Sequence, residues 1–173
     1  KTGNVQKAFE HKYDQYSLIK KIDPTTKDEM HFFLANESLK LYFKLHPDKL
    51  QIAKNNPTII DNYLNQIVVK LNGDELVYGA YLDDEIIGCG YIDNNNHLDS
   101  LFVKEKYRNL GVGSSLLEKL INNCNQTKAI TLNANIEAIS LYERYSFHKT
   151  SDIINCYFVQ MERKPSYGKN LFN

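Results

Sequence analysis

Residues Leu101–Leu117, LFVKEKYRNLGVGSSLL, decide the fold of this chain. The segment begins as a β-like strand, passes through the turn Arg108-Asn109-Leu110-Gly111-Val112-Gly113, and then starts a helix. A helix N-terminus exposes unpaired backbone N–H groups and a partial positive charge. Glycine removes the Cβ atoms that would hold an anion away from those N–H groups. The segment therefore predicts a turn that can hold a phosphate group. Without further context, a plain tight turn explains the same residues.

Two nucleotide-binding motifs fit this turn poorly. A dinucleotide-binding fingerprint needs a third glycine, at the position where Leu116 stands. A P-loop needs lysine after its last glycine, but Gly113 is followed by Ser114 and Ser115. A nucleotide-binding domain that happens to carry a glycine turn is therefore a weak alternative.

The residues around the turn predict alternating strands and helices. Before it, β-like runs at 76–82, 85–93 and 97–104 are separated by short polar turns, which indicates an antiparallel meander. After it, we expect a helix from Val112, a strand at 128–133, a helix at 136–145 and strands at 147–150 and 155–161. In the first half we expect a strand at 16–22, a helix that starts near Thr26 with a capping box to Glu29, a second helical piece at 39–45, and an amphipathic helix at 57–71. This order predicts a mixed α/β domain.

Composition restricts the classes of function. The 173 residues suit one domain, and equal numbers of acidic and basic residues give no sign of a nucleic-acid or anionic-membrane partner. Three widely spaced cysteines and five scattered histidines form no metal-binding pattern, so we expect no metal and a cytoplasmic protein. No apolar run is long enough to span a membrane. We expect residues 1–15 to be an extension and 165–173 a tail.

Two segments together resemble the GNAT N-acetyltransferases. The first is similar to the family's acetyl-CoA-binding motif through Leu101, Val103, Tyr107, Arg108, Gly111, Val112, Gly113, Leu116 and Leu117. The second, NANIEAISLYERYSF at 133–147, is similar to the later motif through Asn133, Ala134, Ala138, Leu141, Tyr142 and Phe147. Glu105 stands where proline is usual, Asn109 where glycine is frequent, and Ser146 where glycine ends the helix. The resemblance covers about residues 76–164, and residues 16–75 fit the family only in outline.

The resemblance implies a fold, a domain and a cosubstrate. The fold is that of the GNAT acyl-CoA N-acyltransferases: a twisted, mostly antiparallel sheet, splayed between its fourth and fifth strands, with helices on both faces. The domain would be residues 16–164, and acetyl-CoA would be the cosubstrate. Pantetheine and the acetyl oxygen would bond the backbone of Leu101, Phe102 and Val103. The pyrophosphate would bond the backbone N–H groups of Arg108, Asn109, Leu110, Gly111, Val112, Gly113 and Ser114. Asn135 and Asn133 would contact the arm of the cofactor.

The resemblance also assigns catalytic roles. Tyr142 matches the general acid that protonates the leaving thiolate, although a lone tyrosine on an apolar helix face is more often a core residue. A base must take the proton of the amine, and Asp99, on the third meander strand, is our first candidate. We place Asp99 on the same strand face as Leu101 and Val103; a solvated edge carboxylate is the competing interpretation. Thr131, Glu137 and His97 are weaker candidates for the base.

The implied reaction is direct attack of a neutral amine on the thioester within a ternary complex. The alternative is a catalytically silent acyl-CoA-binding or regulatory module, against which the presence of Tyr142 argues. The acceptor is either a small-molecule amine or a peptide or protein amine, and a homodimer is compatible with the resemblance. We expect residues 32–71 and 155–161, which are rich in aromatic side chains, to shape the acceptor side.

Overall fold

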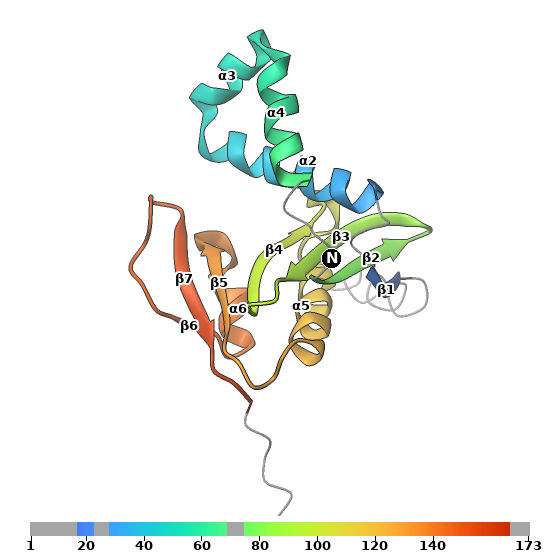
Figure 1. The fold of residues 1–173 in the computed structure, drawn as a ribbon, viewed down its shortest axis with the longest axis vertical. Coiled ribbons are helices and arrows are strands. Elements are labelled where there is room, and N and C mark those ends of the chain that lie inside the picture. The colour runs from blue at the N-terminus through green and yellow to red at the C-terminus, as the bar shows by residue number, and fades with distance from the viewer. Residues whose placement is uncertain (1–16, 23–27, 69–74, 167–173) are drawn as a thin grey trace, which may run out of the picture.

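A seven-stranded sheet forms the centre of the molecule in the computed structural model, which describes residues 17–22, 28–68 and 75–166 (Figure 1). The strand order is β1-β2-β3-β4-β5-β7-β6. In that order, the strands are β1 (Ser17–Ile22), β2 (Leu76–Leu82), β3 (Glu85–Ile92), β4 (His97–Val103), β5 (Ile130–Asn135), β7 (Phe158–Arg163) and β6 (His148–Lys149). The adjacent strands β2, β3 and β4 are the meander that the sequence predicts.

The sheet is splayed between β4 and β5. These two strands are parallel and pair only through His97 with Thr131 and Leu98 with Leu132, whereas every other neighbouring pair is antiparallel. Beyond those two residue pairs the strands diverge toward their C-terminal ends (Figure 1). This confirms the predicted fold class, including the position of the splay between the fourth and fifth strands.

Asn96 holds the closed end of this splay. Its side chain is buried, at 3 % exposure, and its backbone is left-handed with φ 62°. The side-chain amide donates to the carbonyl oxygens of Asn125 at 2.6 Å and Lys128 at 3.3 Å, and the Asn96 carbonyl accepts from the Thr131 N–H at 3.1 Å. One residue thus ties the β3–β4 turn to the loop that leads into β5.

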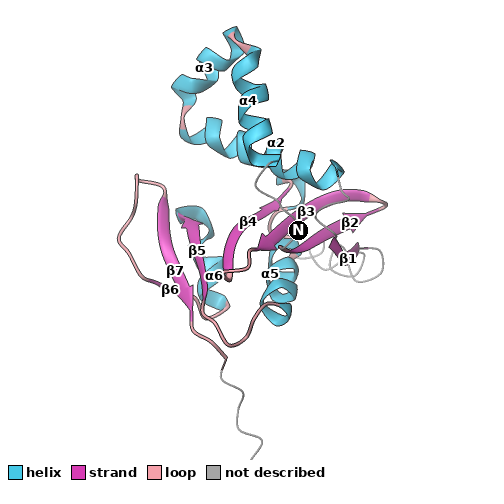
Figure 2. Ribbon diagram, in the orientation of Figure 1, coloured by secondary structure: helices cyan, strands magenta, loops and turns pink. Residues whose placement is uncertain are grey.

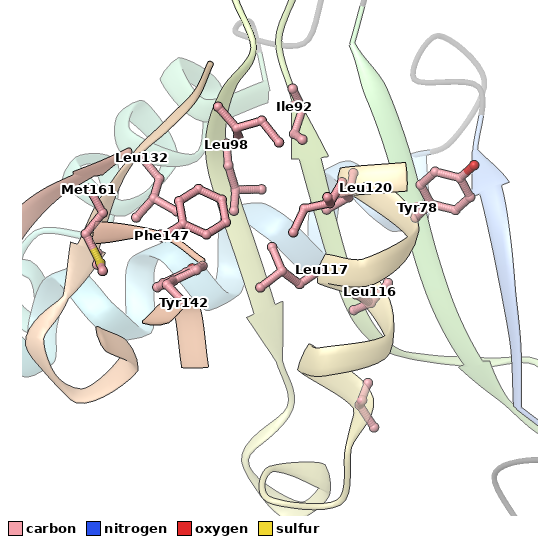
Figure 3. Close-up of a cluster of buried hydrophobic side chains, with 14 of the residues drawn as sticks. Tyr78, Ile92, Leu98, Leu116, Leu117, Leu120, Leu132, Tyr142, Phe147 and Met161 are labelled. Atoms are coloured by element: carbon pink, nitrogen blue, oxygen red, sulfur yellow. The ribbon is translucent and has the colours of Figure 1, made fainter. Parts of the chain in front are cut away.

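Helices cover both faces of the sheet (Figure 2). They are α2 (Asp28–Leu45), α3 (Pro47–Asn55), α4 (Pro57–Val68), α5 (Val112–Asn123) and α6 (Ile139–Arg144), with 3-10 turns η1 (Glu105–Tyr107) and η2 (Ile136–Ala138). Because helical spacing places Leu116, Leu117 and Leu120 on one side of α5, that side packs into the larger apolar core (Figure 3). The opposite face of the sheet is covered by α2, through Met30, Phe33 and Leu34. Among the residues described, no helix is both long and apolar enough to cross a lipid bilayer.

Gly88 explains how closely α5 approaches the sheet. A Cβ atom on this β3 residue would lie 3.0 Å from Leu116 Cδ1 and 3.1 Å from Val112 Cγ1. Those distances are shorter than ordinary van der Waals contact, so a larger residue would push α5 outward. The absence of a side chain here therefore sets the height of the α5 N-terminus above the sheet.

Several predicted boundaries were wrong. Residues 39–45 continue α2 as one helix because no proline or glycine interrupts it between Asp28 and Leu45, and α3 was not predicted. The last strand begins at Phe158, because Asn155 and Cys156 adopt left-handed backbone (φ 51° and 62°) that ends any strand there. The expected capping box at Thr26 and the expected helix end near residue 72 lie outside the described residues.

Ser146 occupies the left-handed position that ends α6, with φ 65°. Because this conformation is strained for serine and not for glycine, we expect Ser146→Gly to raise the free energy of unfolding by about 0.5–1 kcal/mol. Urea denaturation measures the change. The same substitution at Ser140, inside α6, should instead lower the free energy of unfolding by about 1 kcal/mol. A loss of stability at both positions would contradict the assignment of strain to Ser146.

Candidate functional site

A cleft opens where β4 and β5 diverge. It consists of two hollows of about 730 Å³ and 550 Å³, the first toward α2 and the second toward the N-terminus of α5 and α6. Both hollows are lined by the same six residues, Leu101, Val103, Arg108, Asn109, Glu137 and Ala138. The shared lining makes them two parts of one cleft that runs past the end of β4.

The glycine turn forms one wall of the second hollow. Gly111 is the N-cap of α5 with φ 89°, and a Cβ atom added there would meet no atom within 4 Å. Asn109 is also left-handed, with φ 60°, which explains why asparagine can replace a glycine at this position. Gly111, Gly113 and Ser114 line the hollow, and the first N–H groups of a helix have no partner within the helix. The turn therefore has the form of an anion cradle.

Arg108 lies across the end of β4. Its Nε donates to the Val103 carbonyl at 3.0 Å, and its guanidinium is 4.0 Å from the Glu37 carboxylate. The side chain lines both hollows, so it places a positive charge where they join.

Leu101, Phe102 and Val103 line the first hollow from β4. One edge of this strand pairs with β3 along most of its length, from Leu98 to Val103. Its other edge pairs with β5 only at His97 and Leu98. Within the described sheet, the backbone groups of Leu101–Val103 on that second edge have no strand partner. The Val103 carbonyl accepts from Arg108, and the other groups on this edge are available to a ligand.

Tyr142 extends from α6 into the wall of the second hollow. The residue is 8 % exposed, and its ring meets that of Phe147 edge to face with centroids 5.8 Å apart (Figure 3). Burial raises the pKa of Tyr142 to about 12. The hydroxyl group therefore keeps its proton at neutral pH and can serve as a proton donor.

Asp99 is held away from the lining of the cleft. Its carboxylate accepts a short hydrogen bond from the Tyr91 hydroxyl group, and it lines neither hollow. Burial first, and then the neighbouring Asp99, raise the pKa of Tyr91 well above its usual value. The expectation that Asp99 shares a face with Leu101 and Val103 was wrong. Pairing of β3 with β4 skips Asp99, so the strand alternation shifts there.

The two asparagines of the later motif are placed differently. Asn135 lines the first hollow, and its Oδ1 accepts from the Glu137 N–H at 3.0 Å, which caps η2. Asn133 is exposed on β5 and lines neither hollow. Leu110 and Val112 also lie outside both linings, and the Val112 side chain is buried between α5 and the sheet.

The weaker candidates for the base occupy two places. His97 Nδ1 and Thr131 Oγ1 lie 2.9 Å apart at the closed end of the splay, outside both linings. Glu137 lines both hollows, but Lys44 of α2 donates to its two carboxylate oxygens at 2.8 Å each. The hydrogen bond from Lys44 lowers the pKa of Glu137, which makes this carboxylate a weaker base.

Sequence reasoning expected residues 32–71 to shape the acceptor side, but it missed which α2 side chains line the first hollow. Aromatic side chains were expected on this side, but Phe33 is in the core and Phe32 is 68 % exposed on the surface. The α2 residues that line the hollow are instead Glu37, Lys40, Leu41 and Lys44. Glu37 could have been noticed, because it continues the apolar stripe Met30, Phe33, Leu34 at helical spacing and yet carries a charge.

Comparisons with known proteins agree with this geometry. A family model described as "Acetyltransferase (GNAT) domain" matches residues 47–164. PaiA N-acetyltransferase from Thermoplasma acidophilum, solved in complex with coenzyme A, is 23% identical, with 86% of this chain and 98% of that chain covered and a TM-score of 0.57. A structure described as histone acetyltransferase HPA2 and related acetyltransferase, from Corynebacterium glutamicum, is 17% identical, with 90% and 99% covered and a TM-score of 0.64. These identities show a common fold. No curated protein matches the chain.

Proposed function

Because this chain belongs to the GNAT acetyltransferase family, we propose that it transfers an acetyl group from acetyl-CoA to a primary amine within a ternary complex. The observation that carries the proposal is the joining of three features in one cleft: the free edge of β4, the glycine turn and the hydroxyl-bearing Tyr142. The catalytic unit we propose is residues 16–164, and a cytoplasmic location is part of the same proposal.

The proposed cosubstrate fits the cleft in two ways. The pyrophosphate would bond the backbone N–H groups of the turn from Arg108 to Ser114, where no side chain at Gly111 obstructs it. The pantetheine arm would lie along the unpaired edge of Leu101–Val103 and near Asn135. Asn133 enters the proposal only through its family position, because its side chain lies outside the cleft lining.

In the proposed reaction the amine nitrogen attacks the thioester carbon, so a C–N bond forms and the C–S bond breaks. Negative charge develops on the thioester oxygen, and the Val103 N–H is the donor we assign to it. The Phe102 N–H was the other candidate, but strand alternation directs it toward β3, as the Lys104 N–H is directed to the Ile87 carbonyl. Tyr142 gives its proton to the leaving sulfur. The amine's own proton leaves through a base. Asp99 is our candidate for that base, with water carrying the proton to it because Asp99 lies outside the cleft lining.

Thermal unfolding with and without acetyl-CoA tests the cosubstrate. At a ligand concentration about a hundredfold above its dissociation constant, linkage predicts about 2.7 kcal/mol of stabilisation. ATP and NAD serve as controls, because neither nucleotide motif is present in the turn. A shift in Tm with acetyl-CoA alone supports the proposal. No shift, in protein free of bound cofactor, would make the turn purely structural.

A further inference from the structure

Glu37 places a buried carboxylate in the wall of the first hollow. The residue is 4 % exposed, although its neighbours on the same stripe, Phe33 and Leu34, bury only apolar atoms in the core. Removing a carboxylate from water without compensating contacts is costly. A residue that only supported α2 could be apolar at this position, so the charge at Glu37 calls for a further explanation.

The contacts of this carboxylate leave part of its capacity unused. Oε1 accepts a hydrogen bond from the Lys40 ammonium group at 2.5 Å. Oε2 has the Arg108 guanidinium 4.0 Å away, which is beyond hydrogen-bond distance. An ionised carboxylate has about four acceptor positions, so among the described residues Glu37 satisfies only a minority of them.

Lys40 is itself an informative partner. Its side chain is 71% exposed, so its ammonium group can return to water when another cation takes its place at the carboxylate. A primary ammonium group of a ligand has the same chemistry as the Lys40 Nζ. The first hollow is also lined by Phe102 and Val103, where we place the acetyl group. A ligand amine bound at Glu37 would therefore share one hollow with the acyl group that it attacks.

We propose that Glu37 binds the ammonium group of the acceptor and displaces Lys40 from that position. The inference rests on the proposed function and narrows its substrate class to amines that are cations at neutral pH. Aryl amines such as aniline, which are neutral under those conditions, would gain nothing from the carboxylate. After binding, the ammonium group must still lose its proton to a base before attack.

Isothermal titration calorimetry and steady-state kinetics on Glu37→Gln and Lys40→Met test the inference. The probes are n-butylamine, benzylamine and putrescine as cations and aniline as the neutral comparison. Glu37→Gln keeps the shape of the side chain and removes its charge, so KM for the cationic amines should rise about 10- to 100-fold, the loss expected for a charged hydrogen bond. Lys40→Met removes the competing ammonium group, so KM for the same amines should fall. The affinity for acetyl-CoA should stay within about twofold in both variants.

Glu118→Gln, which makes the same change on the exposed side of α5, is the matched control and should leave KM unchanged. The inference is wrong if no cationic probe is acetylated or bound by the wild-type protein, or if aniline is preferred. It is also wrong if Glu37→Gln keeps the wild-type KM, or if Lys40→Met raises it. If wild-type protein fails to bind acetyl-CoA, the proposed function itself fails. Should Glu37→Gln unfold, the response of Lys40→Met alone decides the question.

Discussion

Gly113→Glu is expected to abolish binding of acetyl-CoA while the protein stays folded. Gly113 lines the second hollow at the start of α5, so a glutamate there would place negative charge beside the proposed pyrophosphate position. Two like charges about 4 Å apart at an effective dielectric constant near 20 repel by about 4 kcal/mol, and this corresponds to a loss of about 1000-fold in affinity. A glutamate in the first turn of a helix does not disturb the helix itself, because it complements the helix dipole. Isothermal titration calorimetry measures the affinity.

Gly113→Ala separates charge from bulk. A Cβ atom at this position would lie 3.6 Å from Val103 Cγ2 and 3.8 Å from Leu141 Cδ2, which is ordinary van der Waals contact. The alanine variant should therefore fold, and its affinity for acetyl-CoA should lie within about threefold of wild type. A threefold change in affinity is smaller than the change expected from the loss of one typical hydrogen bond. Wild-type affinity in the glutamate variant would mean that the turn does not hold the pyrophosphate. Loss of affinity already in the alanine variant would show that crowding, not charge, is responsible.

Tyr142→Phe is expected to lower kcat by about 100- to 1000-fold with little change in the affinity for acetyl-CoA. The substitution removes only the hydroxyl group. Burial raises the pKa of this group to about 12, so it is protonated at neutral pH. Without the hydroxyl group, coenzyme A must leave as an unprotonated thiolate or take its proton from water. Steady-state kinetics with a saturating amine gives kcat, and calorimetry gives the affinity.

Tyr78→Phe is the matched control for this prediction. Tyr78 belongs to the same apolar cluster and is equally buried, at 8 % exposure, but it lies on β2 away from the cleft (Figure 3). Its substitution should leave kcat unchanged. If chemistry limits the rate and Tyr142→Phe nonetheless turns over like wild type, Tyr142 is not the acid.

Local sequence determined most of the fold. The meander was predictable because its strands are neighbours in the chain and each pair is joined by a short polar turn. The turn at Arg108–Gly113 and the left-handed backbone of Ser146 were predictable from local sequence. Both need positive φ angles at positions where the family has glycine, and these positions can be read from the motifs. The later motif assigned Tyr142 the role of general acid, and the structure places this residue and the turn in the lining of one hollow.

The site was less predictable where it depends on register or on distant segments. Asp99 was misplaced because the irregular pairing of β3 and β4 is a property of two strands together and has no clear signal in one. Glu37 was missed because the cavity that it lines is completed by β4, and Phe102 of β4 is about sixty-five residues away in the chain. Helix periodicity marks a buried face, but it does not say whether that face meets the core or a ligand.

The arrangement around Asn96 has a mechanical consequence. Strand pairing between the half-sheets β1–β4 and β5–β7–β6 is limited to two residue pairs, and the hydrogen bonds of the buried Asn96 side chain reinforce the same end of the splay. Asn96 therefore lies at the closed end of the splay, and the cleft lies at the open end. A rotation of one half-sheet about the closed end would displace Leu101–Val103 more than His97 and Leu98, because Leu101–Val103 lie farther from that end. The width of the cleft thus depends in part on Asn96, a residue that lines neither hollow.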